Sequence, residues 1–281
     1  MNDKASPLSP GRGRASKAAR ILTAGLSDTP KGRFLLRRAV LLAIKMVLRL
    51  RSSPFFSENI VSALVIAPHQ DDEALGCGGT AALIARKQVP LDLAFVTDGS
   101  ASHPKHAAVS PSEMARRRRD EAREATGILG IEWKRVTFLD VSDGTLSQLD
   151  EHQVMELEDR IAELLKSLSP DAILLPCRRD GSSEHDASFA RVVSALKKTG
   201  LKVRVLEFPV WSWWNPLLLL APIISCQKIW RVNIRPVRGL KSRAIASYTS
   251  QIQAIPPDTE PALPLGFTTM FLGGDEYLFE W

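Results

Sequence analysis

Three acidic side chains and a histidine are crowded into six consecutive residues of this chain. The segment Pro68-His69-Gln70-Asp71-Asp72-Glu73 follows the apolar run Ala63–Ala67 and precedes a glycine-rich stretch that leads into Ala81–Arg86. Like charges at the end of a buried strand repel one another and are poorly solvated unless a positive charge compensates them. A divalent metal ion is the natural compensating charge, so the segment predicts a metal site.

The spacing of these residues suggests a division of roles. His69 and Asp72 lie three positions apart, so a helix that begins here would place them on one side, where both can bind one ion. Asp71 would point elsewhere, and a carboxylate beside a metal can take a proton from metal-bound water. The alternative is that Asp71, Asp72 and Glu73 only favour the positive end of a helix dipole. That alternative explains neither the histidine nor the crowding.

A second strand end supplies a candidate for the third ligand. The apolar run Asp171–Pro176 is followed by a polar segment that ends in Ser182-Ser183-Glu184-His185, and apolar residues then recur at helical spacing. His185 therefore occupies a junction between loop and helix, much as His69 does. A lone histidine at a helix start is more often a surface or capping residue, and only its pairing with the first motif favours a ligand. Catalytic zinc usually has three protein ligands and an open position.

The order of these motifs resembles the PIG-L (LmbE-like) family of zinc-dependent de-N-acetylases. The first motif of that family reads A or P followed by H-P-D-D-E, and the second reads H-P-D-H. The similarity extends over most of residues 62–255 and includes shorter matches at Thr97-Asp98-Gly99-Ser100, Arg118 with Glu121, Leu129-Gly130, Asp143-Gly144, Lys241-Ser242-Arg243-Ala244 and Ser250-Gln251. No later motif is diagnostic alone; the first motif and the ordered series together carry the resemblance.

The resemblance implies a reaction and a role for each matched residue. It implies Asp71 as the general base and a zinc ion bound by three ligands: His69, Asp72 and His185. It also implies that Arg118 and Asp143 approach the sugar or phosphate part of the substrate. The expected reaction removes an N-acetyl group from an N-acetylglucosamine-like amino sugar or glycoconjugate.

Gln70 and Ser182 depart from the family pattern. Gln70 replaces the usual proline, which we expect to matter little because no chemistry is asked of that side chain. Ser182 stands where the second motif has its first histidine, and this leaves open how the leaving amine is protonated. A competing hypothesis is therefore a metal-retaining, catalytically weak sugar- or glycolipid-binding protein of the same fold. Glu184 fits the acidic position of the motif, where a carboxylate can orient a metal-binding histidine.

The loop after the second predicted strand offers further candidates. Asp98 either supports the site from a neighbouring strand end or forms the turn before Gly99. His103 and His106 are alternative proton donors. Nothing in their spacing directs them to the metal, so exposed loop positions are the simpler interpretation.

The elements that must position these residues alternate along the chain. Strand-like runs occur at 62–67, 91–97, 135–140, 171–176 and 202–208, and helical patterns occur at roughly 75–87, 112–128, 150–168 and 185–198. This alternation predicts an α/β fold of Rossmann-like type, with a mostly parallel sheet covered by helices on both faces. We expect a single catalytic domain over residues 53–281, with its ligands at the carboxyl ends of strands.

The N-terminal residues differ from the rest in charge. Residues 1–52 contain twelve Lys or Arg and two Asp, a charge of +10, whereas residues 53–281 contain twenty-five basic and twenty-nine acidic residues, a charge of −4. Residues 1–33 are predicted to be a disordered basic arm. Residues 34–52 predict an amphipathic helix, with Arg38, Lys45 and Arg49 on one face and too few apolar residues to span a bilayer. Such a helix either lies on an anionic membrane surface or packs on the sheet with its basic edge in water.

The stretch Phe208–Ile224 is unusually aromatic and apolar. It holds three of the six tryptophans within four positions, and Pro216 and Pro222 prevent one long helix. Aromatic faces near the metal could stack on a sugar or bury a hydrophobic aglycone. The alternative is a core strand followed by an apolar cover.

Other classes of function fit the sequence less well. Gly76–Gly79 lacks the spacing of a dinucleotide site, and the three cysteines lack the spacing of a zinc cluster or a redox pair. Reduced, buried thiols and the lack of a signal-peptide pattern predict a cytoplasmic protein, peripheral to the membrane if residues 34–52 bind it. No nucleic-acid-binding motif accompanies the basic arm, so we expect no nucleic-acid partner.

Overall fold

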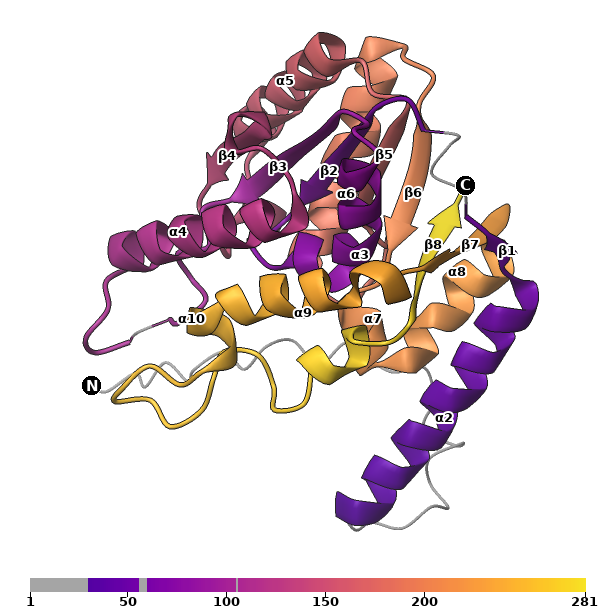
Figure 1. Cartoon of the computed structure of the whole chain (residues 1–281). Coiled ribbons are helices and arrows are strands. Elements are labelled where there is room, and N and C mark those ends of the chain that lie inside the picture. The colour runs from indigo at the N-terminus through magenta and orange to yellow at the C-terminus, as the bar shows by residue number, and fades with distance from the viewer. Residues whose placement is uncertain (1–29, 56–59, 105) are drawn as a thin grey trace, which may run out of the picture.

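The computed structural model describes residues 30–55, 60–104 and 106–281. Its sheet has the strand order β1-β7-β8-β6-β5-β2-β3-β4 (Figure 1). From β6 to β4 all neighbours are parallel, whereas β8 is antiparallel to both β6 and β7. The strands are β1 (Ser53–Pro54), β2 (Ala63–Ala67), β3 (Leu91–Thr97), β4 (Val136–Val141), β5 (Ala172–Pro176), β6 (Arg204–Phe208), β7 (Lys228–Asn233) and β8 (Asp275–Glu280).

The predicted strands form the parallel part of this sheet, β2 to β6, and their bounds agree within two residues. The long helices between these strands are α3 (Asp72–Arg86), α4 (Pro111–Leu129), α5 (Glu151–Leu168) and α6 (Ser183–Thr199). The mostly parallel α/β sheet is therefore confirmed. The sequence did not predict β1, β7 and β8, because irregular segments and short helices separate them and no regular alternation marks their positions.

Both faces of the central strands are buried, because successive side chains point to opposite faces. On one face, Leu64 and Ile66 of β2 pack with apolar residues of α5 and α6. On the other face, Ala63 and Val65 belong to a larger core that includes α3, α4 and α9 (Arg238–Ser247). Helices thus cover the sheet on both sides (Figure 1).

The direction of the chain through the sheet reverses beside β2. The chain runs outward from β2 to β3 and β4, and then returns to β5, which pairs with the other side of β2. The loops that follow β2 and β5 therefore leave in opposite directions and open a crevice at the carboxyl ends of these strands. His69 and His185 lie beyond these two strand ends.

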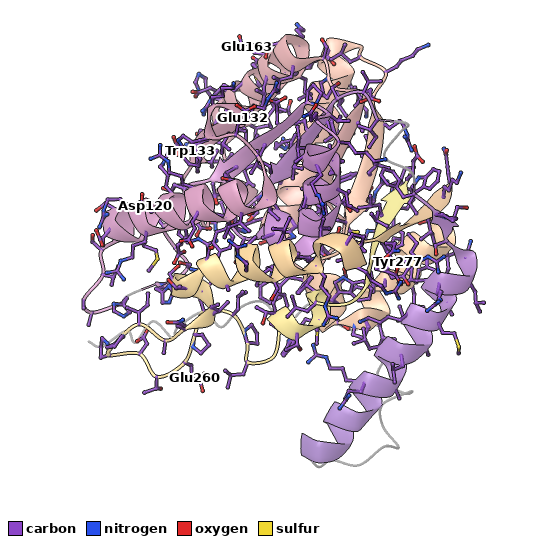
Figure 2. All side chains as sticks on the ribbon, viewed as in Figure 1. Asp120, Glu132, Trp133, Glu163, Glu260 and Tyr277 are labelled. Carbon is purple, nitrogen blue, oxygen red and sulfur yellow. The ribbon has the colours of Figure 1, made fainter. Side chains whose placement is uncertain are left out.

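The helix α2 (Pro30–Arg51) lies at the β1–β7 end of the sheet (Figure 1). It begins four residues before the predicted start at residue 34, and Ile44 and Leu48 are buried in the larger core. Packing of this helix on the body is therefore confirmed, whereas residues 1–29 of the predicted arm lie outside the described residues. Figure 2 shows Tyr277 of β8 at this end of the molecule and Trp133 at the opposite end.

None of the helices in the described part of the chain is both long and apolar enough to cross a membrane.

Candidate metal centre

The turn between β2 and α3 sets the direction of each side chain in the first motif. The carbonyl oxygen of Pro68 accepts hydrogen bonds of 2.9 Å from the backbone N–H and from the hydroxyl of Thr97. Asp71 then adopts a φ of 143°, which residues other than glycine rarely take. This turn begins α3 at Asp72 and directs Asp71 and Asp72 to different places. Strained backbone of this kind clusters at functional sites.

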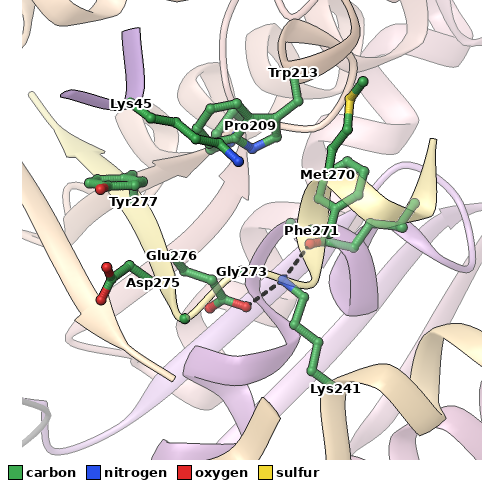
Figure 3. Close-up of a pocket in the computed structure, with 13 residues that line it drawn as sticks. Lys45, Pro209, Trp213, Lys241, Met270, Phe271, Gly273, Asp275, Glu276 and Tyr277 are labelled. Carbon is green, nitrogen blue, oxygen red and sulfur yellow. Dashed lines mark hydrogen bonds and ion pairs between the residues drawn. The ribbon is translucent and has the colours of Figure 1, made fainter. Parts of the chain in front are cut away.

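A buried ion pair holds α3 in place. Cys77 has non-helical backbone angles, so α3 is broken near its middle. Beyond the break, the carboxylate of Glu276 accepts hydrogen bonds from the backbone N–H groups of Gly79 and Thr80, at 2.8 and 2.7 Å. Lys241 pairs with Glu276 at 2.6 Å and is 1% exposed (Figure 3). The Lys241 motif therefore supports α3 from behind and does not belong to the metal centre.

The glycine-rich segment of α3 permits close packing against the sheet. A Cβ atom at Gly76 would lie only 2.0 Å from the ring of Phe208 at the end of β6. A larger residue here would push α3 and its first turn away from the crevice.

Three nitrogen and oxygen atoms from the two strand ends converge. Nδ1 of His69 and Nε2 of His185 each lie 3.2 Å from Oδ2 of Asp72. His185 is fully buried, and its Nε2 has no hydrogen-bond partner in the described structure. Two imidazole nitrogens and one carboxylate form the usual ligand set of a catalytic zinc site, with room for a fourth ligand. These residues therefore fit a metal ion, as the sequence predicted.

The charges around the two histidines favour a cation between them. Although burial disfavours the carboxylate, the histidines hold the pKa of Asp72 well below its usual value. Burial also opposes a charge on His185, yet Asp72 and Asp180 raise the pKa of His185 to about 9. The negative potential of these carboxylates would act on a bound metal ion in the same way.

Asp180 orients His185, a role that no motif in the sequence predicted. Oδ2 of Asp180 lies 2.9 Å from Nδ1 of His185. The same carboxylate accepts hydrogen bonds from the backbone N–H groups of three consecutive residues: Val210, Trp211 and Ser212. An acceptor so anchored keeps the proton of His185 on Nδ1 and leaves the lone pair of Nε2 for a metal.

Only a weak sequence signal marked Asp180. It lies five residues before His185 in the loop after β5, but an Asp before Gly181 is also typical of a turn. The residues that anchor it lie 30 to 32 positions further along the chain. No local pattern connects such distant partners.

Glu184 and Asp143 orient the other histidine. Oε2 of Glu184 lies 2.7 Å and Oδ1 of Asp143 lies 3.2 Å from Nε2 of His69. Acceptors at Nε2 leave Nδ1 of His69 for the metal. Glu184 was predicted to orient a metal-binding histidine, and the structure pairs it with His69 across the crevice.

Asp98 supports this arrangement and also forms the predicted turn. Its Oδ1 accepts hydrogen bonds from the backbone N–H groups of Ser100 and Asp143, at 2.9 and 3.1 Å. Both interpretations of Asp98 are therefore correct. Asp143 itself lines the cavity, where it was predicted to approach the substrate.

Asp71 stands apart from the three converging ligands. Its Oδ1 accepts a hydrogen bond of 3.3 Å from Nη2 of Arg118, a side chain that is only 2% exposed. Burial raises the pKa of Asp71 to about 6, although the nearby guanidinium of Arg118 opposes this shift. A carboxylate with this pKa is ionised near neutral pH and can still accept a proton.

Arg118 faces both the base and the cavity. Besides its bond to Asp71, it lines the cavity, and its Nε and Nη1 have no hydrogen-bond partner among the described residues. Glu73 lies behind this pair: it accepts the backbone N–H of Asp71 at 3.1 Å and the hydroxyl of Tyr248. Glu73 thus fixes the strained turn and does not reach the metal ligands.

Gln70 and Ser182, which both depart from the family pattern, have different surroundings. Gln70 is fully buried, and its Nε2 donates a hydrogen bond of 2.7 Å to the carbonyl oxygen of Thr97. Its side chain therefore ties the ends of β2 and β3 together, a structural role that we did not expect. Ser182 is the N-cap of α6 and lines the cavity.

The two loop histidines do not line the metal cavity. His106 accepts two backbone hydrogen bonds at Nδ1, from Ala108 and Val109, and its Nε2 lies 3.0 Å from the carbonyl oxygen of Ile255. His103 lines an adjoining hollow that shares Asp143 with the main cavity. His106 therefore stabilises the loop, and its side chain is buried, so the prediction of an exposed position is wrong for this residue.

The cavity around the ligands has a volume of about 600 Å³. Charged and hydroxyl side chains line it, and Trp211, Leu263 and Phe267 add apolar surface. Trp211 belongs to the short helix α7 (Trp211–Trp214), whereas Trp213 of the same helix is buried in the core. The tryptophan-rich stretch thus contributes both to the core and to the cavity wall.

Comparison with known proteins agrees with this geometry. The family described as "PIG-L: GlcNAc-PI de-N-acetylase" matches residues 64–196, which include both strand ends of the metal centre. Residues 64–196 form a PIG-L family domain. The family that the motifs resembled is therefore confirmed.

Two relatives of this PIG-L domain protein are named as deacetylases. Over 125 residues it is 30% identical to diacetylchitobiose deacetylase of Thermococcus kodakarensis, a match that covers 44% of this chain and 43% of that protein. Over 201 residues it is 27% identical to the probable N-acetyl-α-D-glucosaminyl L-malate deacetylase 2 of Bacillus cereus, covering 70% of this chain and 86% of that protein. The chain thus matches less than half the length of the first relative.

A solved structure shares the fold. The N,N′-diacetylchitobiose deacetylase of Pyrococcus horikoshii superimposes with a TM-score of 0.56 at 19% identity, covering 81% of each chain. At this identity the likeness shows the fold alone. The chemistry of this protein depends on the residues of its own site.

Proposed function

We propose that this PIG-L protein is a zinc-dependent hydrolase that removes the N-acetyl group from an N-acetylglucosamine-like amino sugar or glycoconjugate. The observation that carries the proposal is the separation of two functions within one cavity. His69, Asp72 and His185 converge at one point, while Asp71 lies beside them and accepts a hydrogen bond from Arg118. The deacetylase names of two relatives support the choice of an acetylated amino sugar.

The residues of this chain divide the work of amide hydrolysis. A zinc ion on the three ligands would supply a Lewis acid and would lower the pKa of its bound water. Asp71 accepts the proton that the attacking water loses, and Arg118 keeps this carboxylate ionised. Hydrolysis of the C–N bond yields acetate and the free amine, which must gain a proton as it leaves.

The cavity has the size and polarity for a sugar. Its volume of about 600 Å³ accommodates a ligand of that class. Asp143 and Arg118 line it and can accept and donate hydrogen bonds to hydroxyl groups, as the family resemblance implies. The indole of Trp211 forms an apolar wall on which a sugar face can stack.

Protonation of the leaving amine is the least conventional part of the proposal. Ser182 cannot supply a cation near neutral pH, and its hydroxyl accepts the backbone N–H of His185 at 3.5 Å. Asp71 therefore remains the candidate donor, acting first as base and then as acid. If this route is slow, the competing hypothesis applies: a metal-retaining, catalytically weak sugar- or glycolipid-binding protein.

One experiment separates the two hypotheses. Zinc-loaded protein is incubated with a panel of N-acetylated amino sugars, and free amine is measured alongside binding of the same sugars. The enzyme hypothesis predicts amine release that Asp71→Asn reduces by roughly two to four orders of magnitude with zinc content unchanged. Sugar binding without amine release would support the binding protein instead.

A further inference from the structure

The outward face of α2 is apolar. Leu42, Met46 and Leu50 follow one another at intervals of four and are 67%, 63% and 81% exposed. A helix that packs on a protein core normally exposes polar side chains to water. This face of α2 exposes apolar side chains instead. Contiguous exposed apolar side chains mark a surface that binds a protein or a membrane.

A second element extends this apolar surface. Residues 216–225 form a 3-10 turn, η4 (Pro216–Leu219), and the short helix α8 (Leu220–Ser225). Leu217, Leu220 and Ile224 of this segment are 39%, 44% and 74% exposed. The six residues form the α2–α8 face: Leu42, Met46, Leu50, Leu217, Leu220 and Ile224.

α2 and α8 lie side by side. The guanidinium of Arg51, the last residue of α2, donates to the carbonyl oxygen of Ile223 in α8. Figure 1 shows α8 beside α2, at the β1–β7 end of the sheet. The two sets of exposed apolar residues therefore belong to one region of the surface.

The basic residues of α2 do not form the single exposed edge that the sequence predicted. Lys45 is partly buried and turns inward, with Nζ 5.3 Å from the centre of the Trp213 ring (Figure 3). Arg38 and Arg49 are exposed and flank the apolar residues. The outward side of α2 is thus an apolar strip with basic borders.

The two segments that carry the α2–α8 face contain no acidic residue. Residues 30–51 contain seven Lys or Arg and residues 216–233 contain two, a charge of +9. The other residues contain twenty-eight basic and thirty-one acidic side chains, a charge of −3. Figure 2 shows Asp120, Glu132 and Glu163 on the side of the molecule away from α2. The elements that carry the apolar face are therefore positively charged.

An apolar surface with basic borders favours one kind of partner. A second copy of the chain would bring two α2–α8 faces together across a two-fold axis, and like charges would then meet. An anionic lipid surface supplies both an apolar layer for the leucines and negative headgroups for the flanking arginines. We propose that the α2–α8 face docks this protein on an anionic membrane surface, without any helix crossing it.

Vesicle binding tests the proposal on the full-length protein and needs no catalytic activity. The protein is sedimented with vesicles of equal parts phosphatidylcholine and phosphatidylglycerol, and with vesicles of phosphatidylcholine alone. We expect binding to the anionic vesicles that weakens as salt is raised, because charge contributes to it. Equal binding to both vesicle types, or none to either, would overturn the proposal.

Substitutions locate the contact. The variant Leu42→Ser/Met46→Ser/Leu50→Ser and the variant Leu220→Ser/Ile224→Ser should each lower the vesicle partition coefficient at least tenfold. A matched control replaces two apolar residues that are equally exposed elsewhere, Val61→Ser/Met155→Ser, which are 76% and 59% exposed. The control should bind as the wild type does.

Two further results would contradict the proposal. One is undiminished vesicle binding by both face variants, with thermal unfolding as the check that each variant folds. The other is a wild-type dimer, seen in analytical ultracentrifugation, that the face variants dissociate, which would make a second copy the partner. Because the readout is sedimentation, failure here leaves the proposed hydrolysis untouched, and absence of hydrolysis leaves the docking result valid.

Discussion

Replacement of Asp180 by Asn offers a sharp test of the metal centre, because this residue contacts only one of the proposed ligands. Its carboxylate accepts the Nδ1–H of His185 at 2.9 Å, and it also accepts three backbone N–H groups of the segment that follows β6. An amide at this position must place its NH₂ group either at Oδ2, which faces His185 and the N–H of Trp211, or at Oδ1, which faces the N–H of Ser212. Either orientation replaces an acceptor by a donor.

The structure sets the size of the expected effect. If the NH₂ group faces His185, the ring proton moves to Nε2 and the lone pair needed by the metal is lost. Loss of a carboxylate that orients a metal-bound histidine typically lowers metal affinity 10- to 100-fold. This change corresponds to about 1.4 to 2.7 kcal/mol. If the NH₂ group instead faces the N–H of Ser212, the metal-free protein loses about 1 to 3 kcal/mol of stability through the unsatisfied buried groups.

Two measurements distinguish these outcomes. Zinc affinity is measured by competition with a chelator, and the free energy of unfolding is measured in urea with and without zinc. Asp186→Asn is the matched control, because Asp186 lies next to His185 in the first turn of α6. In the described structure the Asp186 carboxylate accepts only the backbone N–H of Arg179. Wild-type zinc affinity together with wild-type stability in Asp180→Asn would refute the assignment of Nε2 of His185 as a metal ligand.

Three other predictions test the site. Replacement of His69, Asp72 or His185 by alanine should lower zinc affinity at least tenfold, as measured by elemental analysis after dialysis. Stoichiometric zinc in one of these variants would show that the replaced residue is not a ligand. Arg118→Met should move the acid limb of the pH–rate profile to higher pH, because the guanidinium lowers the pKa of Asp71 and its loss delays ionisation of the base. An unchanged limb would mean that another group is the base. Ser182→His should raise turnover and add a basic limb if the missing acid limits the rate, while its loss of the N-cap of α6 should cost about 1 kcal/mol in urea unfolding. Unchanged turnover in a folded Ser182→His variant would show that protonation of the amine is not limiting.

The sequence was sufficient for the parts of this protein that local pattern encodes. Apolar runs that alternate with helical periodicity fixed β2 to β6 and the helices between them, because each buried strand and each amphipathic helix carries its own period. The pair of strand-end motifs also identified the candidate ligands. Parallel strands bring their carboxyl ends to one edge of the sheet, so His69 and His185 had to meet if β2 and β5 were neighbours.

Tertiary structure decided the contacts that join distant segments. Asp180 acquires its role from backbone donors of residues 210–212, and Glu184 is paired with His69 across the crevice. The antiparallel strand β8 and the ion pair that supports α3 depend on residues near the end of the chain. None of these leaves a periodic trace in the sequence.

The helix α2 also shows that local sequence patterns do not determine which residues are buried. The sequence alone predicted a helix with apolar and basic positions over residues 34–52, since helical spacing is a local property, and α2 covers Pro30–Arg51. It could not determine which apolar residues are buried, because a helix with apolar side chains around most of its circumference can pack in more than one rotation. Only the docked helix shows Ile44 and Leu48 inside and Leu42, Met46 and Leu50 outside. The physical reason is that burial depends on the partner surface, which distant parts of the chain supply.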